Sequence, residues 1–347
     1  MRILGRRLPL LRILLNASVA TALALTSIAC AQPGRGLTIA ASRDLEFVGG
    51  TIHVDFAAGS LDLSQDQILA HIHDAATAVA AYYGHLPVER DRILVVPVPG
   101  GRGIEHGTTW GDMAGFPAMT RIHIGQHTTE GDLKDDWMIT HELVHTAFPS
   151  LPDDQHWMEE GLATYIEPIA RVMTGELTAR QVWEDMVRDM PKGQPQEGDR
   201  GLDQTHTWGR TYWGGALFCL VADVEIRRET HNRKGLRDAL RAVVEHGGTI
   251  DHDWDLPRAL AVGDEATGTR VLTEQYAKWK GSPAKVDLDK LWADLGIHHN
   301  GDEIEFIGNA PLAEIREAIA HSSAASSAMV SSAASDSSGT SHWRRIL

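Results

Sequence analysis

Cysteine is nearly absent from this sequence of 347 residues, which contains only Cys30 and Cys219. Cys30 lies at the end of an N-terminal segment, where cleavage would remove it or a lipid would occupy it. No disulfide within the folded chain is therefore expected, even in an oxidising compartment. Cys219 lies in an apolar stretch, and we expect it to be buried and inert.

Basic side chains are also few, because 32 lysines and arginines stand against 47 acidic residues and give a formal net charge of −15. Four of the arginines lie within the first 31 residues, which contain no acid. The rest of the chain is therefore more acidic still, and such a surface repels phosphate backbones. We expect no nucleic-acid partner.

Long apolar runs are limited to residues 13–29, which four arginines precede or enter. A membrane span needs about 18–20 apolar residues, so this run is marginal as an anchor. Small residues follow it, and residues 1–31 are typical of an export signal. Cleavage after Ala31 leaves Gln32 as the new N-terminus; alternatively, Cys30 becomes the lipidated first residue of a lipoprotein and the only membrane attachment. Either alternative predicts an exported protein, periplasmic or secreted.

The order of β-prone and helical segments predicts the α+β class. Residues 37–60 predict a hairpin, because two glycines separate two β-prone runs, and from Asp135 onward apolar residues recur at helical spacing. Strands followed by helices are typical of α+β domains. We expect one domain over residues 61–300 and a disordered Ser/Ala-rich tail over residues 321–347. Strands are expected over residues 93–98 and 121–124, and helices over residues 61–84, 135–148, 157–173, 178–190, 211–230, 235–246, 269–280 and 287–295.

The strongest chemical signal is the motif H-E-L-V-H at residues 141–145. His141 and His145 are four residues apart and share one face of a helix, so both imidazoles can reach one metal ion. Glu142 then lies beside the open coordination position, where a general base for metal-bound water must sit. A chain with 18 histidines can contain this motif by chance, but here it lies within an apolar helical pattern. The motif therefore predicts a catalytic zinc site.

A catalytic zinc site needs a third protein ligand and keeps a fourth position for water. Residues 156–165 predict the start of a second helix, and the chain before it is long enough to fold that helix back against the first. Either Glu159 or Glu160 could be the ligand, because adjacent residues point about 100° apart on a helix. The spacing alone leaves both open.

Residues 157–165, W-M-E-E-G-L-A-T-Y, resemble the W-x-N-E-G-F-A-x-Y stretch of the gluzincin aminopeptidases, which include aminopeptidase N and the glycyl aminopeptidases. In that family the Glu before Gly is the third zinc ligand, which implies Glu160 here, with Glu159 in place of the usual Asn. Only fourteen residues separate His145 from Glu160, fewer than in aminopeptidase N, so the linking loop must differ.

A second stretch, T-Y-W-G-G-A-L-F at residues 211–218, is similar to the family's Y-x-K-G-A-L segment. This implies that Tyr212 donates a hydrogen bond to the oxyanion of the tetrahedral intermediate, although Gly214 replaces the family's Lys. The likeness covers about residues 65–297. No segment long enough for the PDZ domain of the glycyl aminopeptidases follows residue 300.

The resemblance implies a zincin-like fold, with a mixed-sheet lobe that carries the active-site helix and a mainly helical second lobe. It implies one Zn²⁺ per chain and a peptide or protein substrate. An aminopeptidase also needs a carboxylate for the ammonium group of the substrate, and Glu105, in a G-I-E-H stretch similar to the family's G-L-E-H, is the first candidate and Glu159 the second. Arg210 could bind the substrate backbone or a carboxylate, with a surface role as the alternative.

Three functions remain in competition. The first is a zinc peptidase that acts on an exposed N-terminal amine. The second is a zinc hydrolase of a non-peptide amide, and the third is a binding module on a peptidase scaffold that no longer turns over. The presence of Glu142 argues against the third.

Overall fold

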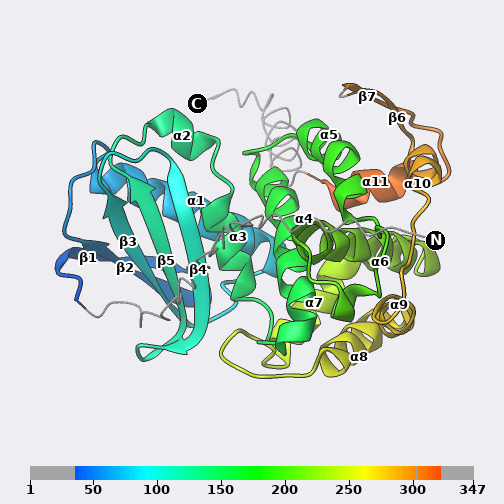
Figure 1. Cartoon of the computed structure of the whole chain (residues 1–347), viewed down its shortest axis with the longest axis horizontal. Coiled ribbons are helices and arrows are strands. Elements are labelled where there is room, and N and C mark those ends of the chain that lie inside the picture. The colour runs from blue at the N-terminus through cyan, green and yellow to red at the C-terminus, as the bar shows by residue number, and fades with distance from the viewer. Residues whose placement is uncertain (1–35, 302, 322–347) are drawn as a thin grey trace, which may run out of the picture. The chain divides into compact units, whose positions relative to one another are not determined.

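The computed structural model describes residues 36–301 and 303–321, which form a five-stranded sheet followed by a mainly helical region (Figure 1). The α+β class predicted from the sequence is confirmed. The predicted export signal and the predicted tail from residue 322 onward lie outside the described residues. Within the described ranges, no helix is both long enough and apolar enough to span a bilayer.

The sheet has the strand order β1-β2-β3-β5-β4, and β4 is an edge strand. β1 and β2 pair antiparallel, β2–β3 and β3–β5 pair parallel, and β4 returns antiparallel beside β5. The turn between β1 and β2 contains Gly49, whose φ of 91° favours glycine. The strand bounds are β1 (Ile39–Phe47), β2 (Gly50–Ala57), β3 (Arg90–Val98), β4 (Ile104–Met113) and β5 (Phe116–Gly125).

Helix α1 (Gln65–Tyr83) begins at a capping box and ends at a left-handed glycine. The Ser64 hydroxyl accepts the backbone N–H of Gln67, whose side chain in turn accepts the backbone N–H of Ser64. The cap residue Gly84 has a φ of 97°. Buried residues at helical spacing, including Ile68 and Ile72, join those of β2 and β3 in one core.

The predicted metal-binding helix is α3 (Met138–His145), which follows the short α2 (Glu130–Lys134). Its first turn is capped by Asp136, whose carboxylate accepts the backbone N–H groups of Met138 and Ile139 at 3.0 and 3.3 Å. His71 of α1 bonds the same carboxylate at 2.9 Å. Asp136 thus fixes both the start of α3 and its attachment to α1.

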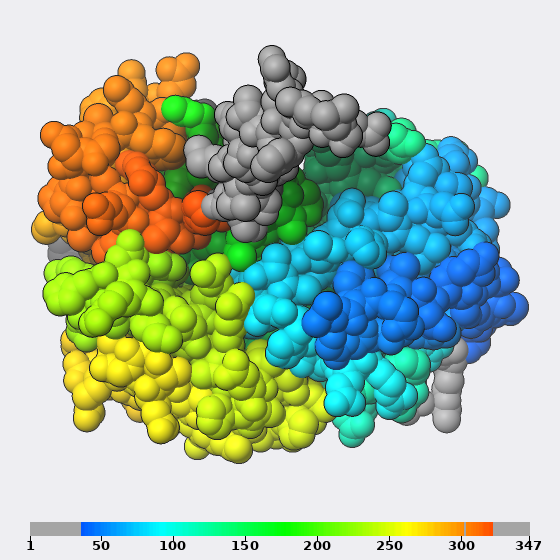
Figure 2. All heavy atoms as spheres, turned by 180° about the vertical axis from the view of Figure 1, so that it is seen from behind, coloured from blue at the N-terminus to red at the C-terminus, as the bar shows by residue number. Residues whose placement is uncertain are grey.

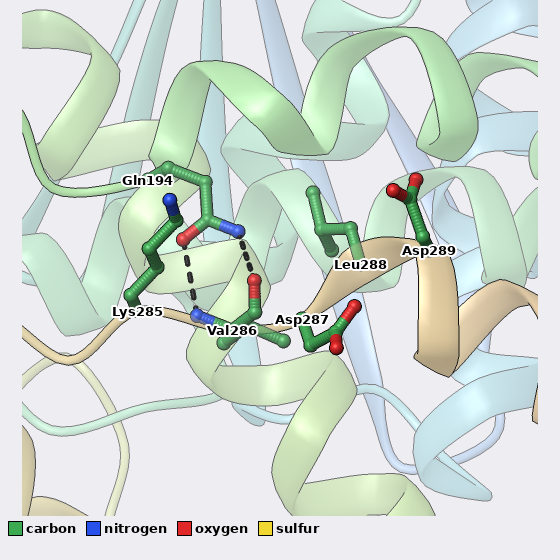
Figure 3. A pocket seen from close by; sticks show the side chains of 6 residues that line it. All are labelled: Gln194, Lys285, Val286, Asp287, Leu288 and Asp289. Atoms are coloured by element: carbon green, nitrogen blue, oxygen red, sulfur yellow. Dashed lines mark hydrogen bonds between the residues drawn. The ribbon is translucent and has the colours of Figure 1, made fainter.

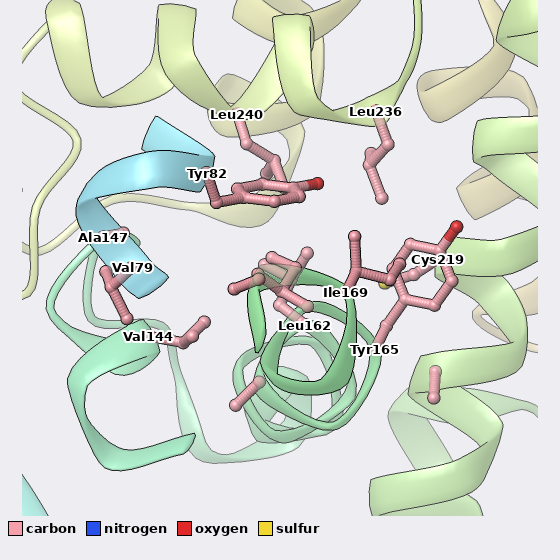
Figure 4. Packing of buried hydrophobic residues seen from close by; sticks show 14 of the residues in the cluster. Val79, Tyr82, Val144, Ala147, Leu162, Tyr165, Ile169, Cys219, Leu236 and Leu240 are labelled. Atoms are coloured by element: carbon pink, nitrogen blue, oxygen red, sulfur yellow. The ribbon is translucent and has the colours of Figure 1, made fainter. Parts of the chain in front are cut away.

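Helix α4 (His156–Thr174) runs through the core between α1, α3 and the later helices. Cys219 on α6 is fully buried beside it, as predicted, and burial raises the pKa of its thiol. Figure 4 shows the residues that meet around α4, which are Val79, Tyr82, Val144, Ala147, Leu162, Tyr165, Ile169, Cys219, Leu236 and Leu240.

Most helices after α4 match the predicted ranges, but the sequence did not predict helices α8 and α11 or the hairpin of strands β6 and β7 in this region. Earlier in the chain, α2 and β4 were not predicted either. A π-helical turn, Gly209–Gly214, precedes α6. In the space-filling view from behind, residues of the sheet and α1 lie at one side and the later helices at the other (Figure 2). The remaining bounds are α5 (Ala179–Asp189), α6 (Gly215–Glu229), α7 (Leu236–Glu245), α8 (Leu256–Thr267), α9 (Val271–Trp279), α10 (Leu288–Leu295), β6 (Ile297–Asn300), β7 (Glu303–Phe306) and α11 (Ala313–Ile319).

Candidate metal centre

Three potential ligands from two helices converge in the structure. His141 and His145 lie one turn apart on α3, with ring centroids 5.0 Å apart. From α4, Oε2 of Glu160 lies 3.1 Å from Nε2 of His141 and 3.8 Å from Nε2 of His145. The three ligand atoms all lie within 4.8 Å of one another, and the side chains are largely buried. Of the two adjacent carboxylates, Glu160 is therefore the one that joins the histidines.

The separation of these atoms fits a zinc ion. A tetrahedral Zn²⁺ about 2.0–2.1 Å from each ligand atom holds those atoms about 3.3–3.5 Å apart. The two distances from Glu160 Oε2 lie on either side of this value, so small side-chain shifts suffice. The donor set, two imidazoles and one carboxylate, is that of many catalytic zinc sites.

The protonation states of the ligands also fit. Burial lowers the pKa of His145 to about 3, and His141 adds to this effect, so the imidazole is neutral. Burial alone would raise the pKa of Glu160, but hydrogen bonds from His141 and His156 lower it overall and keep the carboxylate ionised. Zinc binds neutral imidazole and ionised carboxylate, which are the forms that His145 and Glu160 take near neutral pH.

Glu142 lies beside the ligands and is held by the edge strand β4. Its side chain is buried, and Oε2 accepts a hydrogen bond of 2.7 Å from the Thr109 hydroxyl. Burial raises the pKa of Glu142, although Thr109 and His141 oppose the shift. The close approach of β4 requires Gly107, because a Cβ there would lie 2.7 Å from Cγ of Glu142. Sequence patterns did not identify Thr109 as part of the site.

Tyr212 comes from the π-helical turn before α6, and its ring stacks on His141 with centroids 6.3 Å apart. Burial raises the pKa of Tyr212 to about 12, and the nearby carboxylates of Glu160 and Glu142 add to the shift. The hydroxyl therefore keeps its proton and can donate a hydrogen bond. This is the property that an oxyanion donor needs.

Two glycines bring Tyr212 and Glu160 into one site. A Cβ on Gly161 of α4 would lie 2.3 Å from Cα of Gly215, and a Cβ on Gly215 would lie 2.2 Å from the carbonyl oxygen of Trp157. The backbones of α4 and α6 therefore touch one residue after Glu160 and three residues after Tyr212. Any larger side chain would separate the two helices.

These groups line one cleft of about 630 Å³. Strand β4 supplies one wall with residues 106–111, and α3, α4 and Tyr212 supply the other. Apolar side chains extend the cleft beyond the charged centre, among them Met113, Ile250 and Trp137, which is 48% exposed. No lysine or arginine lines the cleft in the described ranges.

Of the predicted substrate-binding residues Glu159 and Glu105, only the first lines the cleft. Glu159 lines the cleft, where its oxygens accept hydrogen bonds from the backbone N–H of Leu151 at 3.3 Å and from His156 at 3.0 Å. Glu105 does not line it: the residue is exposed, and its Oε1 lies so close to Gly101 that a Cβ there would be 1.7 Å away. The bulge between Ile104 and His106 turns Glu105 away and presents His106 to the cleft instead.

Arg210 is also not a cleft residue. Its side chain is 2% exposed, and Nε lies 2.8 Å from Oδ2 of Asp199. Nη1 donates a hydrogen bond to the carbonyl oxygen of Gly193. Both alternatives weighed for Arg210, substrate binding and a surface role, are therefore corrected to a buried ion pair that fixes the loop before the π-helical turn.

His156 belongs to the cleft although sequence patterns did not single it out. Nδ1 lies 3.0 Å from Oε2 of Glu159, and Nε2 lies 3.1 Å from Oε1 of Glu160. Hydrogen bonds to Glu159 and then Glu160 raise the pKa of His156 to about 10. The sequence did contain a signal for this contact. Glu159 and Glu160 follow His156 by three and four residues, which places both beside it on a helix.

A second surface hollow of about 540 Å³ lies between Gln194 and residues 285–289 (Figure 3). The amide of Gln194 is already paired with the backbone of Val286, at 2.6 Å for the amide nitrogen and 3.1 Å for the amide oxygen. Asp287 caps the first turn of α10. Gln194 and Asp287 thus serve the fold, which favours the cleft at His141, His145 and Glu160 as the functional site.

No protein-family model matches the sequence, and no curated protein matches it. Among solved structures, an aminopeptidase N family protein from Idiomarina loihiensis matches with a TM-score of 0.55 and 12% identity, covering 74% of this chain and 49% of that one. An M1 zinc metallopeptidase from Deinococcus radiodurans gives a TM-score of 0.45 and 16% identity over 71% of this chain and 54% of its own. The chain spans about half the length of these structures. The first match shows that the chain is similar in fold to part of an aminopeptidase N family protein.

Proposed function

We propose that this chain is a zinc-dependent peptidase of the gluzincin type. The observation that carries the proposal is the convergence of His141, His145 and Glu160 with Glu142 and Tyr212 in one cleft. The proposed ligands and base come from α3 and α4, and the proposed oxyanion donor comes from the turn before α6. Only the tertiary structure brings these groups together. The similarity in fold to part of an aminopeptidase N family protein supports the same proposal.

The bound zinc would supply a Lewis acid that polarises the scissile carbonyl and makes water more acidic. The carboxylate of Glu142 takes a proton from the attacking water and later delivers it to the leaving amine. Its raised pKa makes it a stronger base than an exposed carboxylate. The Tyr212 hydroxyl donates to the oxyanion, a contribution worth about 3–4 kcal/mol in the transition state.

An aminopeptidase-like reaction would depend on Glu159. With Glu105 turned away, Glu159 is the cleft carboxylate outside the metal ligands and the base. Each of its oxygens already accepts one hydrogen bond, but a carboxylate oxygen can accept two. A substrate ammonium group can therefore still bind there. Peptide pairs with free and acetylated N-termini test this directly.

We further propose that the protein is exported, either cleaved before Gln32 or lipidated at Cys30, and that it acts on peptides or proteins. The acidic balance of the chain supports the absence of a nucleic-acid partner. Mass spectrometry of the mature N-terminus distinguishes cleavage from lipidation.

The deciding experiment compares the purified protein with Glu142→Gln. Bound zinc is measured by elemental analysis, and cleavage of a mixed peptide library is read by mass spectrometry. We expect one zinc in both proteins and trimming of peptides by the parent alone. Zinc without cleavage by the parent would favour a hydrolase of a non-peptide amide or a silent binding module, and absence of zinc would refute the metal centre.

A further inference from the structure

The two oxygens of the Glu160 carboxylate have different partners. Oε2 lies toward His141 and His145, at 3.1 and 3.8 Å. Oε1 faces His156, whose Nε2 is 3.1 Å away. One oxygen is thus directed at the metal position, and the other is held by an imidazole from one turn earlier on the same helix.

His156 is itself held in place. Its Nδ1 lies 3.0 Å from Oε2 of Glu159, and Oε1 of Glu159 accepts the backbone N–H of Leu151 at 3.3 Å. Both ring nitrogens of His156 therefore face carboxylate oxygens, which only donors can satisfy. The contacts form a continuous chain from the backbone of the α3–α4 loop, through Glu159 and His156, to Glu160.

An exposed ion pair on a helix surface contributes little to stability. The pair here differs, because the His156 ring is 53% exposed while the side chain of Glu160 is only 11% exposed and points into the cleft. Tyr212 also lies near the Glu160 carboxylate, but in the proposed reaction its hydroxyl donates to the oxyanion. His156 holds Oε1 of Glu160 without a part in that reaction.

We propose that His156 is a positioning residue that holds Glu160 with Oε2 presented to the metal, and that Glu159 anchors His156 for this task. This inference rests on the proposed metal centre, not on the identity of the substrate. Partners of this kind, which orient a metal ligand from behind, typically change metal affinity 10–100-fold when they are removed.

The test measures zinc affinity and does not depend on activity. The full chain is stripped of metal, and zinc is titrated against a chromophoric chelator that competes for it. The variants are His156→Ala, His156→Gln and Glu159→Gln. The matched control is His127→Ala, because His127 is similarly exposed at 55% and pairs with one carboxylate, Asp62, at 2.8 Å.

We expect His156→Ala to bind zinc at least tenfold more weakly than the parent. His156→Gln should recover part of this loss, because its amide can still donate to Oε1 of Glu160, and Glu159→Gln should lose less than His156→Ala. His127→Ala should stay within twofold of the parent. The melting temperatures of the metal-free variants should match that of the parent, because the His156 ring is half exposed.

The proposal is overturned if His156→Ala binds zinc within twofold of the parent, or if His127→Ala loses as much affinity as His156→Ala. Should His156→Ala fail to fold, His156→Gln decides: a loss of threefold or more supports the role, and unchanged affinity refutes it. A parent that binds zinc but cleaves no peptide would refute the proposed function and leave this result standing.

Discussion

Asp91 on β3 is a buried carboxylic acid whose oxygens have no hydrogen-bond partner in the described part of the chain. It is 2% exposed and faces a small cavity of about 10 Å³, the size of one water. Apolar side chains from β2, α1 and α3 line this cavity, together with Thr146 at the end of α3, and none of them is charged. An unpaired buried carboxylate is costly, so we expect the fold to favour the protonated form.

The effect of Asp91 on the free energy of unfolding follows from the shift in its pKa. Burial raises the pKa of Asp91 from 3.8 to about 7. The backbone N–H of Arg92 lies near enough to oppose the shift in part, although it makes no hydrogen bond of normal geometry to the carboxylate. The folded state then holds the proton more tightly than the unfolded state. The free energy of unfolding is unaffected by Asp91 below about pH 4 and falls as the pH rises to about 7, by about 4 kcal/mol in total. Between pH 5 and pH 8 the loss is about 2.5 kcal/mol.

The assay is urea unfolding of the metal-free protein at pH 5 and pH 8, for the parent and for Asp91→Asn. The variant lacks the titrating group, so the stability of the parent relative to Asp91→Asn should drop by about 2.5 kcal/mol between the two pH values. The control is Asp189→Asn, a buried carboxylate whose pKa is held below its usual value, despite burial, by Arg188 and Lys192. Because both partners stay charged from pH 5 to pH 8, the stability of the parent relative to Asp189→Asn should be the same at both pH values. A change of less than about 0.5 kcal/mol for Asp91 would mean that the carboxylate is hydrated or paired, and would refute the reasoning.

Three further predictions concern the cleft. Tyr212→Phe should lower kcat about 10²–10³-fold with unchanged zinc content, measured by steady-state kinetics and elemental analysis; an equal loss of zinc would show a structural role instead. Gly161→Ala should force α4 and α6 apart, lower the free energy of unfolding in urea by about 1–3 kcal/mol and lower activity. The control is Gly198→Ala, at a glycine with open space around it. It should lose only the stability that an alanine loses at a positive φ of 84°. Trp137→Ala should raise KM about tenfold for peptides with a large apolar residue beside the scissile bond and leave KM for alanine peptides nearly unchanged; equal effects on both peptide sets would contradict this.

Most helices after residue 135 and the strands over residues 93–98 and 121–124 could be predicted, because burial leaves a pattern in the residues themselves. The edge strand β4 was missed for the opposite reason. Its sequence, I-E-H-G-T-T-W-G-D-M, has no regular alternation, and nearly all its residues are partly exposed. Helix α8 was missed although its signals were present: Asp255 caps it and a proline lies in its first turn.

The cluster of His141, His145 and Glu160 could be predicted because the two histidines share one face of a helix, and the family resemblance favoured Glu160 over Glu159. The positions of Arg210 and Glu105 depended on partners that neither helical nor strand spacing relates to them. Arg210 is buried because Asp199, eleven residues earlier, neutralises it, and Glu105 is turned away by a bulge that forms only when β4 pairs with β5. Neither the ion pair of Arg210 nor the bulge at Glu105 can be predicted from the spacing of residues in the sequence.

Glycines place both walls of the cleft. Each wall of the cleft is placed by a contact that a side chain would prevent: Gly107 admits Glu142 beside β4, and Gly161 admits Gly215 beside α4. The second contact lies next to Glu160 and Tyr212, so the spacing of these two groups depends on backbone approach rather than on side-chain packing. Backbone contacts of this kind tolerate almost no change in volume. The glycines beside the motifs are therefore as much a part of the proposed site as the residues proposed to carry its chemistry, and a search for this site in other sequences should require them together with H-E-x-x-H.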